Sequence, residues 1–337
     1  MSGTATAGRL PMTLIGRSDI IRHFSMTEAI ACMETAFKAL SGETGDVPHR
    51  FASDLNDGAL TLLFKPASIH GDVQSSVKML IQKNGFSVPG VPTITGVVML
   101  VDNRSGEILS ILDGETLTAL RTGAASGLAT QCLSKADART MALFGCGAQG
   151  RTQVEAVSSV RGIEKIWLFD SNPDNAQRLI QEMQPQLSAR MEVADDLSVL
   201  KEADIVCTAT QARAPLFDLA ALKPGVHINA IGSFRPGMNE LHSDVLRSAR
   251  VYLDDGPACL EESGDLIGLF STPSEREEVV QGEIGDLLLH RIEGRQSPQE
   301  ITVFKSVGNA IQDFVVAREI YVKSQQAGFG RDFDLFE

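Results

Sequence analysis

The feature that most constrains this chain is an apolar run over residues 141–144 that leads directly into three spaced glycines. The pattern Gly145-x-Gly147-x-x-Gly150 is followed by helical periodicity over residues 152–160, and a second apolar run over 166–169 ends at Asp170. This order of strand, glycine loop, helix, strand and acid is typical of a βαβ unit that binds a dinucleotide. A glycine-rich turn without a ligand is the alternative.

Each position in this pattern has a physical reason. Gly145 permits the tight turn, Gly147 lets a pyrophosphate approach the backbone, and Gly150 lets the helix pack close to the sheet. Asp170 is placed to accept hydrogen bonds from the ribose hydroxyls and would repel a 2′-phosphate. The acid is followed by Ser-Asn-Pro, so there is no arginine next to it to bind a 2′-phosphate. The sequence therefore favours NAD(H) over NADP(H).

The composition excludes several classes of protein. A net charge of -13 argues against a nucleic-acid or anionic-membrane partner. No apolar run approaches the length of a bilayer span, and residues 1–11 are small and polar, as expected of a tail rather than a signal. Five cysteines without CxxC spacing predict buried thiols in a reducing cytoplasm, with neither disulfides nor a bound metal.

The hydrophobic pattern divides the chain into three zones. The first predicts a helix after a capping box at residues 25–28, then short strands joined in part by a hairpin turn at 102–106, and a helix over 117–133. These strands are expected at 60–64, 77–81, 97–101 and 108–112. Hairpins indicate an antiparallel sheet.

The second zone, residues 134–300, alternates strands with helices, which predicts a mainly parallel sheet. Its strands are expected at 140–144, 165–169, 191–193, 205–209, 226–231 and 251–253. The third zone begins with a strand or loop at 301, continues as a helix over 309–322, and is expected to pack back on the first. The prediction is an α/β protein with a doubly wound Rossmann-type domain, 134–304, and an α+β substrate-binding and dimerisation domain, 12–133 plus 305–337.

Three cations in the first zone stand among apolar or small neighbours. These are Arg50 in a proline-marked loop, Lys78 in an alternating strand pattern, and Arg121 in a segment of small residues. A cation in such surroundings is costly unless paired, and a substrate carboxylate is one partner that would suit it. Pairing with a protein acid, or extension of the side chain to water, is the alternative for each.

Four motifs together resemble the ornithine cyclodeaminase/μ-crystallin family, in order from about residue 15 to residue 321. They are LTALRTGAAS at 117–126, FGCGAQG at 144–150, AIGSFRPG at 230–237 and VFKSVGN at 303–309. The resemblance implies a homodimer joined through antiparallel sheets, with an active site between the two domains of a subunit. It also implies that Arg50, Lys78 and Arg121 hold the substrate carboxylate.

One departure from the family pattern bears on the reaction. Cyclodeaminases of this family resemble one another in an aspartate two residues before the proline of the third motif, and here Phe234 takes that position. A phenyl ring neither accepts a proton nor hydrogen-bonds an ammonium group, so ornithine cyclodeamination is disfavoured. Reduction of a preformed cyclic imine, Δ1-pyrroline-2-carboxylate or its six-membered homologue, needs only a carboxylate clamp, a hydride and a proton.

The expected reductase site assigns two catalytic residues. Arg121 would hold the substrate carboxylate bidentately, and Lys78 would donate the proton if burial lowers its pKa. Thr95 and Ser306 either add substrate hydrogen bonds or are satisfied core hydroxyls, Phe234 would line the substrate site, and Asp313 is either on a solvated face or a partner for a cation. The expected cofactor contacts are Gly145, Gly147, Ala148, Gln149, Gly150, Asp170, Thr122, Thr208, Ala209, Thr210, Ile231, Gly232 and Ser233.

Three alternatives to the reductase remain open. The family also contains lyases, namely ornithine cyclodeaminase and a hydroxyproline dehydratase, which would consume no nicotinamide. An alanine-type dehydrogenase would need free ammonia. A non-enzymatic binding protein would bind NADH without turnover.

Overall fold

The computed structural model describes residues 11–86, 88 and 90–334, so residues 1–10 of the expected tail lie outside the description. The described chain forms two compact units. The first contains the chain up to Ser25, Asp46–Thr118, and the chain from Asp313 onward, and the second contains Met26–Gly45 and Ala119–Gln312. The predicted domain boundaries, 12–133 plus 305–337 and 134–304, stay a prediction.

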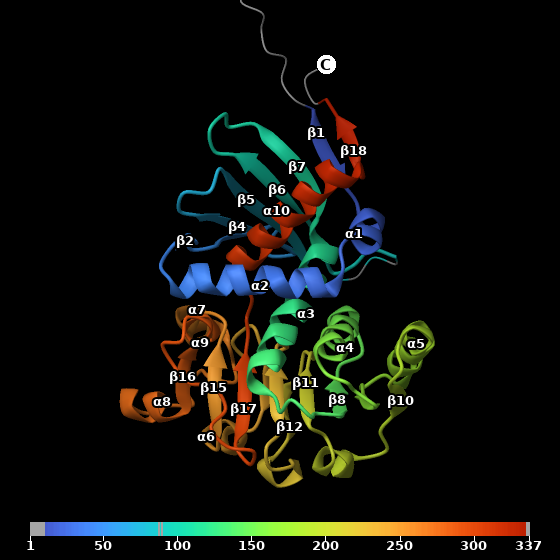
Figure 1. Cartoon of the computed structure of the whole chain (residues 1–337), viewed down its shortest axis with the longest axis vertical. Helices are drawn as coiled ribbons and strands as arrows, with labels where there is room; N and C mark the ends of the chain where they lie inside the picture. The colour runs from blue at the N-terminus through green and yellow to red at the C-terminus, as the bar shows by residue number, and fades with distance from the viewer. Residues whose placement is uncertain (1–10, 87, 89, 335–337) are drawn as a thin grey trace, which may run out of the picture. The chain divides into compact units, whose positions relative to one another are not determined.

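The first unit is built on a mixed, mostly antiparallel sheet (Figure 1). Its strands are β18 (Arg331–Phe333), β1 (Met12–Ile15), β7 (Ile108–Asp113), β6 (Ile94–Asp102), β5 (Gln74–Lys83), β4 (Leu60–Ile69) and β2 (Gly45–Asp46) in spatial order, with β3 (Phe51–Leu55) paired to β4. The hairpin predicted between β6 and β7 is confirmed. The short β1 was not expected, and it runs parallel to β7, so the sheet is not wholly antiparallel.

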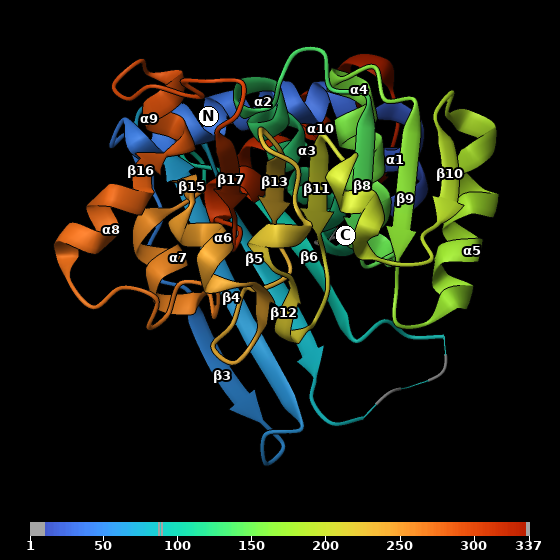
Figure 2. The same cartoon turned by 90° about the horizontal axis from the view of Figure 1, so that it is seen from below.

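The second unit contains a parallel sheet of eight strands. In spatial order they are β10 (Arg190–Val193), β9 (Lys165–Phe169), β8 (Thr140–Phe144), β11 (Ile205–Thr208), β13 (His227–Ala230), β17 (Ile301–Lys305), β15 (Ala249–Leu253) and β16 (Val280–Glu283), and Figure 2 shows them side by side in that order. All six strands predicted for this zone are present. A separate small pair joins β12 (Arg213–Phe217) to β14 (Asn239–Leu241).

The segment at 301 was left open as a strand or loop. It forms β17, which pairs with β13 and β15 inside the parallel sheet, where the predicted Rossmann-type domain ends at residue 304. Its sequence, Ile-Thr-Val-Phe-Lys, is mostly buried, and a strand buried on both faces carries no alternation that would reveal its sheet.

The helices cover these sheets. They are α1 (Arg17–His23), α2 (Met26–Ser41), α3 (Gly114–Leu133), α4 (Ala148–Val160), α5 (Pro173–Met183), α6 (Ser243–Arg247), α7 (Gly256–Glu262), α8 (Pro273–Val279), α9 (Ile284–Leu288) and α10 (Ala310–Ala327). Alternate residues of β8 enter two separate apolar clusters, Met141 and Leu143 with α4 and α5, Ala142 and Phe144 with the opposite face. The parallel sheet is therefore buried on both faces, as a Rossmann-type sheet must be.

Candidate functional site

The glycine loop, residues 145–150, follows β8 as predicted and is tight at its two ends. A Cβ placed on Gly145, whose φ is 93°, would lie 2.5 Å from the carbonyl oxygen of Ala209, and one on Gly150 would overlap the carbonyl oxygen of Gly145. A Cβ on Gly147 meets nothing within 4 Å. The backbone is thus closed where packing requires glycine and open where a pyrophosphate would approach the start of α4.

Asp170 directly follows β9, beside this loop. Its Oδ2 accepts the amide of Cys146 at 2.7 Å, and its Oδ1 accepts the amide of Asn172 at 2.9 Å and Nδ2 of Asn175 at 3.1 Å. A carboxylate has about four acceptor positions, so these three bonds leave capacity for a ribose hydroxyl. The bond to Cys146 fixes the acid against the glycine loop.

The thiol of Cys146 within this loop is not a reactive group. Burial, reinforced by the charge of Asp170, raises its pKa to about 12, so it stays protonated at neutral pH.

The remaining predicted cofactor residues lie mainly at the carboxyl ends of two neighbouring strands. Residues 208–210 end β11 and residues 231–233 follow β13, and both strands run parallel to β8. The chain proceeds from β8 to β9 and β10 on one side, while β11 and β13 lie on the other. This is the topological switch point at which doubly wound sheets bind their ligands.

Two further acids at this edge were not assigned a role from the sequence. Glu240, from β14, accepts hydrogen bonds from both of these strand ends. Asp254, which follows β15, accepts the Oγ of Ser306 at 2.6 Å and the amide of Gly308 at 2.8 Å. Glu240 follows the quoted third motif by three residues, but nothing in the sequence reveals which distant groups it faces.

Arg121 projects from α3 into a closely fitted position. Its side chain is buried, and Nη1 donates to Oε1 of Gln312 at 2.8 Å. Gly308 lies against the guanidinium, because a Cβ there would be 2.5 Å from Nη1. Thr122, the next residue, is also buried. The hydroxyl of Ser306 donates a hydrogen bond to Asp254, as expected if it is a satisfied core hydroxyl. Its role in substrate binding stays a prediction.

Lys78 occupies the middle of β5 in the first unit. It is 1% exposed, and its Nζ lies 3.0 Å from Oδ1 of Asp313, which is fully buried on α10. Asp313 is therefore a cation partner and not part of a solvated face. Lys65 of β4 stands directly opposite Lys78 in the sheet register, so the two side chains leave the same face of the sheet.

The other predicted substrate residues are less enclosed. Arg50 is exposed just before β3, and Thr95 lies on β6 opposite Ile81. Phe234 is half-buried in the second unit, and the guanidinium carbon of Arg235 lies 5.4 Å from the centre of its ring.

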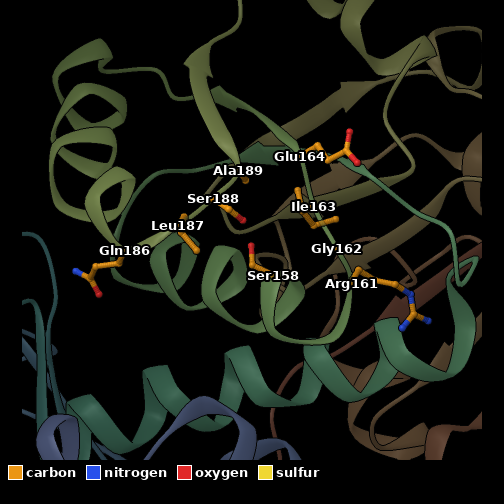
Figure 3. Close-up of a pocket in the computed structure, with 9 residues that line it drawn as sticks. All are labelled: Ser158, Arg161, Gly162, Ile163, Glu164, Gln186, Leu187, Ser188 and Ala189. Atoms are coloured by element: carbon orange, nitrogen blue, oxygen red, sulfur yellow. The ribbon is translucent and has the colours of Figure 1, made fainter.

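A separate pocket of about 360 Å³ lies at the opposite edge of the parallel sheet (Figure 3). Residues 161–164, which precede β9, and residues 186–189, which precede β10, form most of its lining. This amino-terminal edge carries none of the predicted site residues.

The described residues contain neither a metal-binding cluster nor a membrane-spanning helix. No group of three or more histidine, cysteine, aspartate or glutamate side chains in this part of the chain is arranged to hold a metal ion. Among the same residues, no helix is long and apolar enough to cross a membrane. All five cysteines are free thiols.

Comparison with known proteins places the chain among enzymes of nicotinamide chemistry. A Δ1-pyrroline-2-carboxylate reductase of Bacillus cereus is 36% identical over 95% of this chain and 98% of its own length. The structure of the Thermococcus litoralis Δ1-pyrroline-2-carboxylate reductase in complex with NADH and L-proline superposes with a TM-score of 0.88 at 32% identity, covering 95% of this chain and all of that one.

A second solved structure and a family-wide pattern agree with this. An archaeal alanine dehydrogenase dimer with bound NAD gives a TM-score of 0.86 at 26% identity, over 97% of this chain and 100% of that chain. Residues 12–328 match the sequence pattern of the ornithine cyclodeaminase/mu-crystallin family. The chain belongs to the ornithine cyclodeaminase/mu-crystallin family.

Proposed function

We propose that this protein reduces Δ1-pyrroline-2-carboxylate, or its six-membered homologue, to the saturated cyclic amino acid with NADH. The chain is an NAD(P)-dependent reductase of its family, and the proposal concerns the substrate and the residues that act on it. The relationship to the Bacillus cereus reductase over nearly the whole of both chains carries the proposal. In the reaction, a hydride adds to the imine carbon and a proton to the imine nitrogen.

The second unit supplies the cofactor site in this proposal. NADH bound at the glycine loop supplies the hydride, and the open space above Gly147 suits a pyrophosphate at the start of α4. Asp170 favours NADH over NADPH because its carboxylate would lie close to a 2′-phosphate and repel it.

The substrate carboxylate is held by Arg121 and Lys78, with Arg50 as a third cation. The planar guanidinium of Arg121 matches a carboxylate with two parallel hydrogen bonds, and Gln312 orients it. The protein partners of the two buried cations, Gln312 and Asp313, are consecutive in the sequence. If both cations grip one carboxylate, substituting both should weaken substrate binding by less than the sum of the single effects.

Lys78 also provides the proton. Its Nζ is held 3.0 Å from Oδ1 of Asp313, and it donates a proton to the imine nitrogen as negative charge develops there. After the transfer, a proton from solvent restores the ammonium form of Lys78.

Phe234 argues against ornithine cyclodeamination, as it did from the sequence. Ornithine cyclodeamination requires a group that handles an amine and water, and a half-buried ring stacked with Arg235 offers neither acceptor nor base. Thr95 and Ser306 complete the proposed substrate lining, with Phe234 beside the ring.

The assembly and location follow the relatives and the thiols. An archaeal relative is a dimer, and we propose the same state for this chain. Five free cysteines suit the reducing cytoplasm, where we place the protein.

The test is loss of nicotinamide absorbance when protein, NADH and Δ1-pyrroline-2-carboxylate are mixed, with NADPH in a parallel cell. Rapid loss with NADH, faster than with NADPH, is the expected result. NADH binding without turnover would overturn the substrate assignment. Ammonia release from ornithine, or water loss from hydroxyproline, would identify a lyase, and turnover of pyruvate only with added ammonia would identify an alanine dehydrogenase.

A further inference from the structure

The carboxylate of Glu240 joins the two strand ends that line the proposed cofactor site. Its Oε1 accepts the amide of Thr210 at 2.7 Å and the Oγ1 of the same residue at 2.8 Å. Its Oε2 accepts Oγ1 of Thr208 at 2.8 Å, the amide of Gly232 at 2.8 Å and that of Ser233 at 3.2 Å. Five donors thus converge on one side chain that is 0% exposed.

The approach of these groups leaves no spare room. A Cβ on Gly232 would overlap both Oε1 of Glu240 and the carbonyl oxygen of Thr210. The backbone after β13 is therefore drawn against both the acid and the end of β11.

A second buried acid holds Glu240 in place. Oδ1 of Asp265 accepts the amides of Glu240 at 2.7 Å and Leu241 at 3.1 Å, and Oδ2 of Asp265 pairs with Nζ of Lys305 at 2.9 Å. The pKa of Glu240 lies above its ordinary value because the side chain is buried. The charge of Lys305 and the hydrogen bonds from Thr208 and Thr210 oppose this rise without cancelling it. Burying charge is costly, so a hydrophobic core alone does not account for this arrangement.

The donor set requires a carboxylate and not an amide. A glutamine at this position would point its NH₂ group either at the amide of Thr210 or at the amides of Gly232 and Ser233. In both orientations a buried N–H faces another N–H donor, and at least one strand end loses its partner.

We propose that Glu240 is a positioning residue that fixes residues 208–210 and 231–233 in the conformation that binds the dinucleotide. The inference rests on the proposed cofactor site and deepens it. Without Glu240 the two strand ends must be ordered by the ligand itself, and that ordering weakens binding. Loss of Glu240 should therefore lower the affinity for NADH, although no atom of Glu240 needs to touch the ligand.

The experiment is a fluorescence titration of NADH into wild-type protein and Glu240→Gln, with thermal melting of each. Loss of hydrogen bonds to a charged group is expected to weaken NADH binding by about 10- to 150-fold. The KM for NADH should rise in parallel, while kcat at saturating NADH stays within about threefold of wild type, since the positioned loops are restored once the ligand is bound.

The matched control is Asp204→Asn at the amino edge of the same sheet. Asp204 is also buried, and it accepts the amides of Arg139 at 2.8 Å and Thr140 at 3.2 Å, and Nζ of Lys223 at 2.6 Å. This substitution removes a buried carboxylate that accepts a similar set of hydrogen bonds. The carboxylate lies just before β11, at the opposite end of the strand from residue 208, so the affinity of the variant for NADH should stay within about twofold of wild type.

Two results would overturn the inference. One is a folded Glu240→Gln protein with wild-type affinity for NADH, and the other is equal weakening in Asp204→Asn. If the glutamine variant does not fold, NADH is titrated into Glu240→Asp, whose shorter carboxylate keeps the charge but reaches only one strand end. Weakened NADH binding is then the expected result, and wild-type affinity would overturn the inference. Wild-type protein that binds NADH but reduces no imine contradicts the proposed substrate and leaves this inference standing.

Discussion

The substitution Gly308→Ala tests whether the fitted position of Arg121 matters for the substrate. Gly308 has a φ of 81°, and a Cβ there would lie 2.5 Å from Nη1, 2.9 Å from Nη2 and 3.1 Å from Cζ of Arg121. Ordinary contact begins near 3.4 Å, so the guanidinium must retreat by about 1 Å. That retreat moves it off the position set by Gln312.

The expected size of the effect follows from this displacement. A misplacement of about 1 Å in a substrate-binding group costs about 100-fold in rate, equivalent to about 2.7 kcal/mol. The positive φ adds about 1–2 kcal/mol to the free energy of folding, which a protein with about 5–15 kcal/mol of stability survives. We therefore expect kcat/KM for the imine to fall by about 10- to 100-fold in a folded protein, mainly through KM, with NADH affinity unchanged.

Steady-state kinetics with the imine varied, beside an NADH titration and a melting curve, measure this. Gly106→Ala is the control, because Gly106 has a φ of 75° in the β6–β7 turn but meets nothing within 4 Å. It carries the same backbone cost without touching Arg121. A Gly308→Ala enzyme with wild-type kcat/KM, or an equal loss in Gly106→Ala, would refute the reasoning.

Three further predictions concern a proton, a phosphate and acid stability. Lys78→Met should lower kcat at saturating substrate by about 100-fold or more, the contribution of a general acid, and a change below about threefold would remove Lys78 from that role. Asp170→Ser should raise the kcat/KM ratio of NADPH to NADH by about tenfold or more, because a carboxylate no longer faces the 2′-phosphate, and an unchanged ratio would contradict that placement. Burial lowers the pKa of His227 from 6.5 to about 3. Below pH 6.5 the unfolded chain therefore binds a proton at His227, whereas the folded protein does not. The contribution of neutral His227 to the free energy of unfolding is fully present above pH 6.5. It is lost at up to about 1.4 kcal/mol per pH unit as the pH falls towards 3. Denaturant unfolding of His227→Gln should show a shallower loss over this range, and an identical slope would contradict it.

The sequence by itself determined the local elements and the cofactor loop. Strands β8, β9, β10, β11, β13 and β15, the β6–β7 hairpin, and helices α3, α4 and α10 were all predicted from periodicity and from turn residues that lie close together in the sequence. The glycine loop was predictable for the same reason, since its turn, helix start and acid lie within one βαβ unit.

The tertiary structure decided which distant residues meet. Asp313 pairs with Lys78 across 235 positions of sequence, and Gln312 bonds Arg121 across 191. The sequence left Asp313 between a solvated face and a cation partner, because a lone acid in a helix reads the same in either case. It also left the segment at 301 between a strand and a loop, since a strand buried on both faces carries no alternation.

Glu240 shows the same division at the cofactor site. Its place just after the third motif was visible, but its five donors come from two strand ends that only the parallel register of β11 and β13 brings together. Local pattern is set by each residue's own backbone geometry and its near neighbours. Partner choice depends on loop closure and core packing, which a single sequence does not encode in any short window.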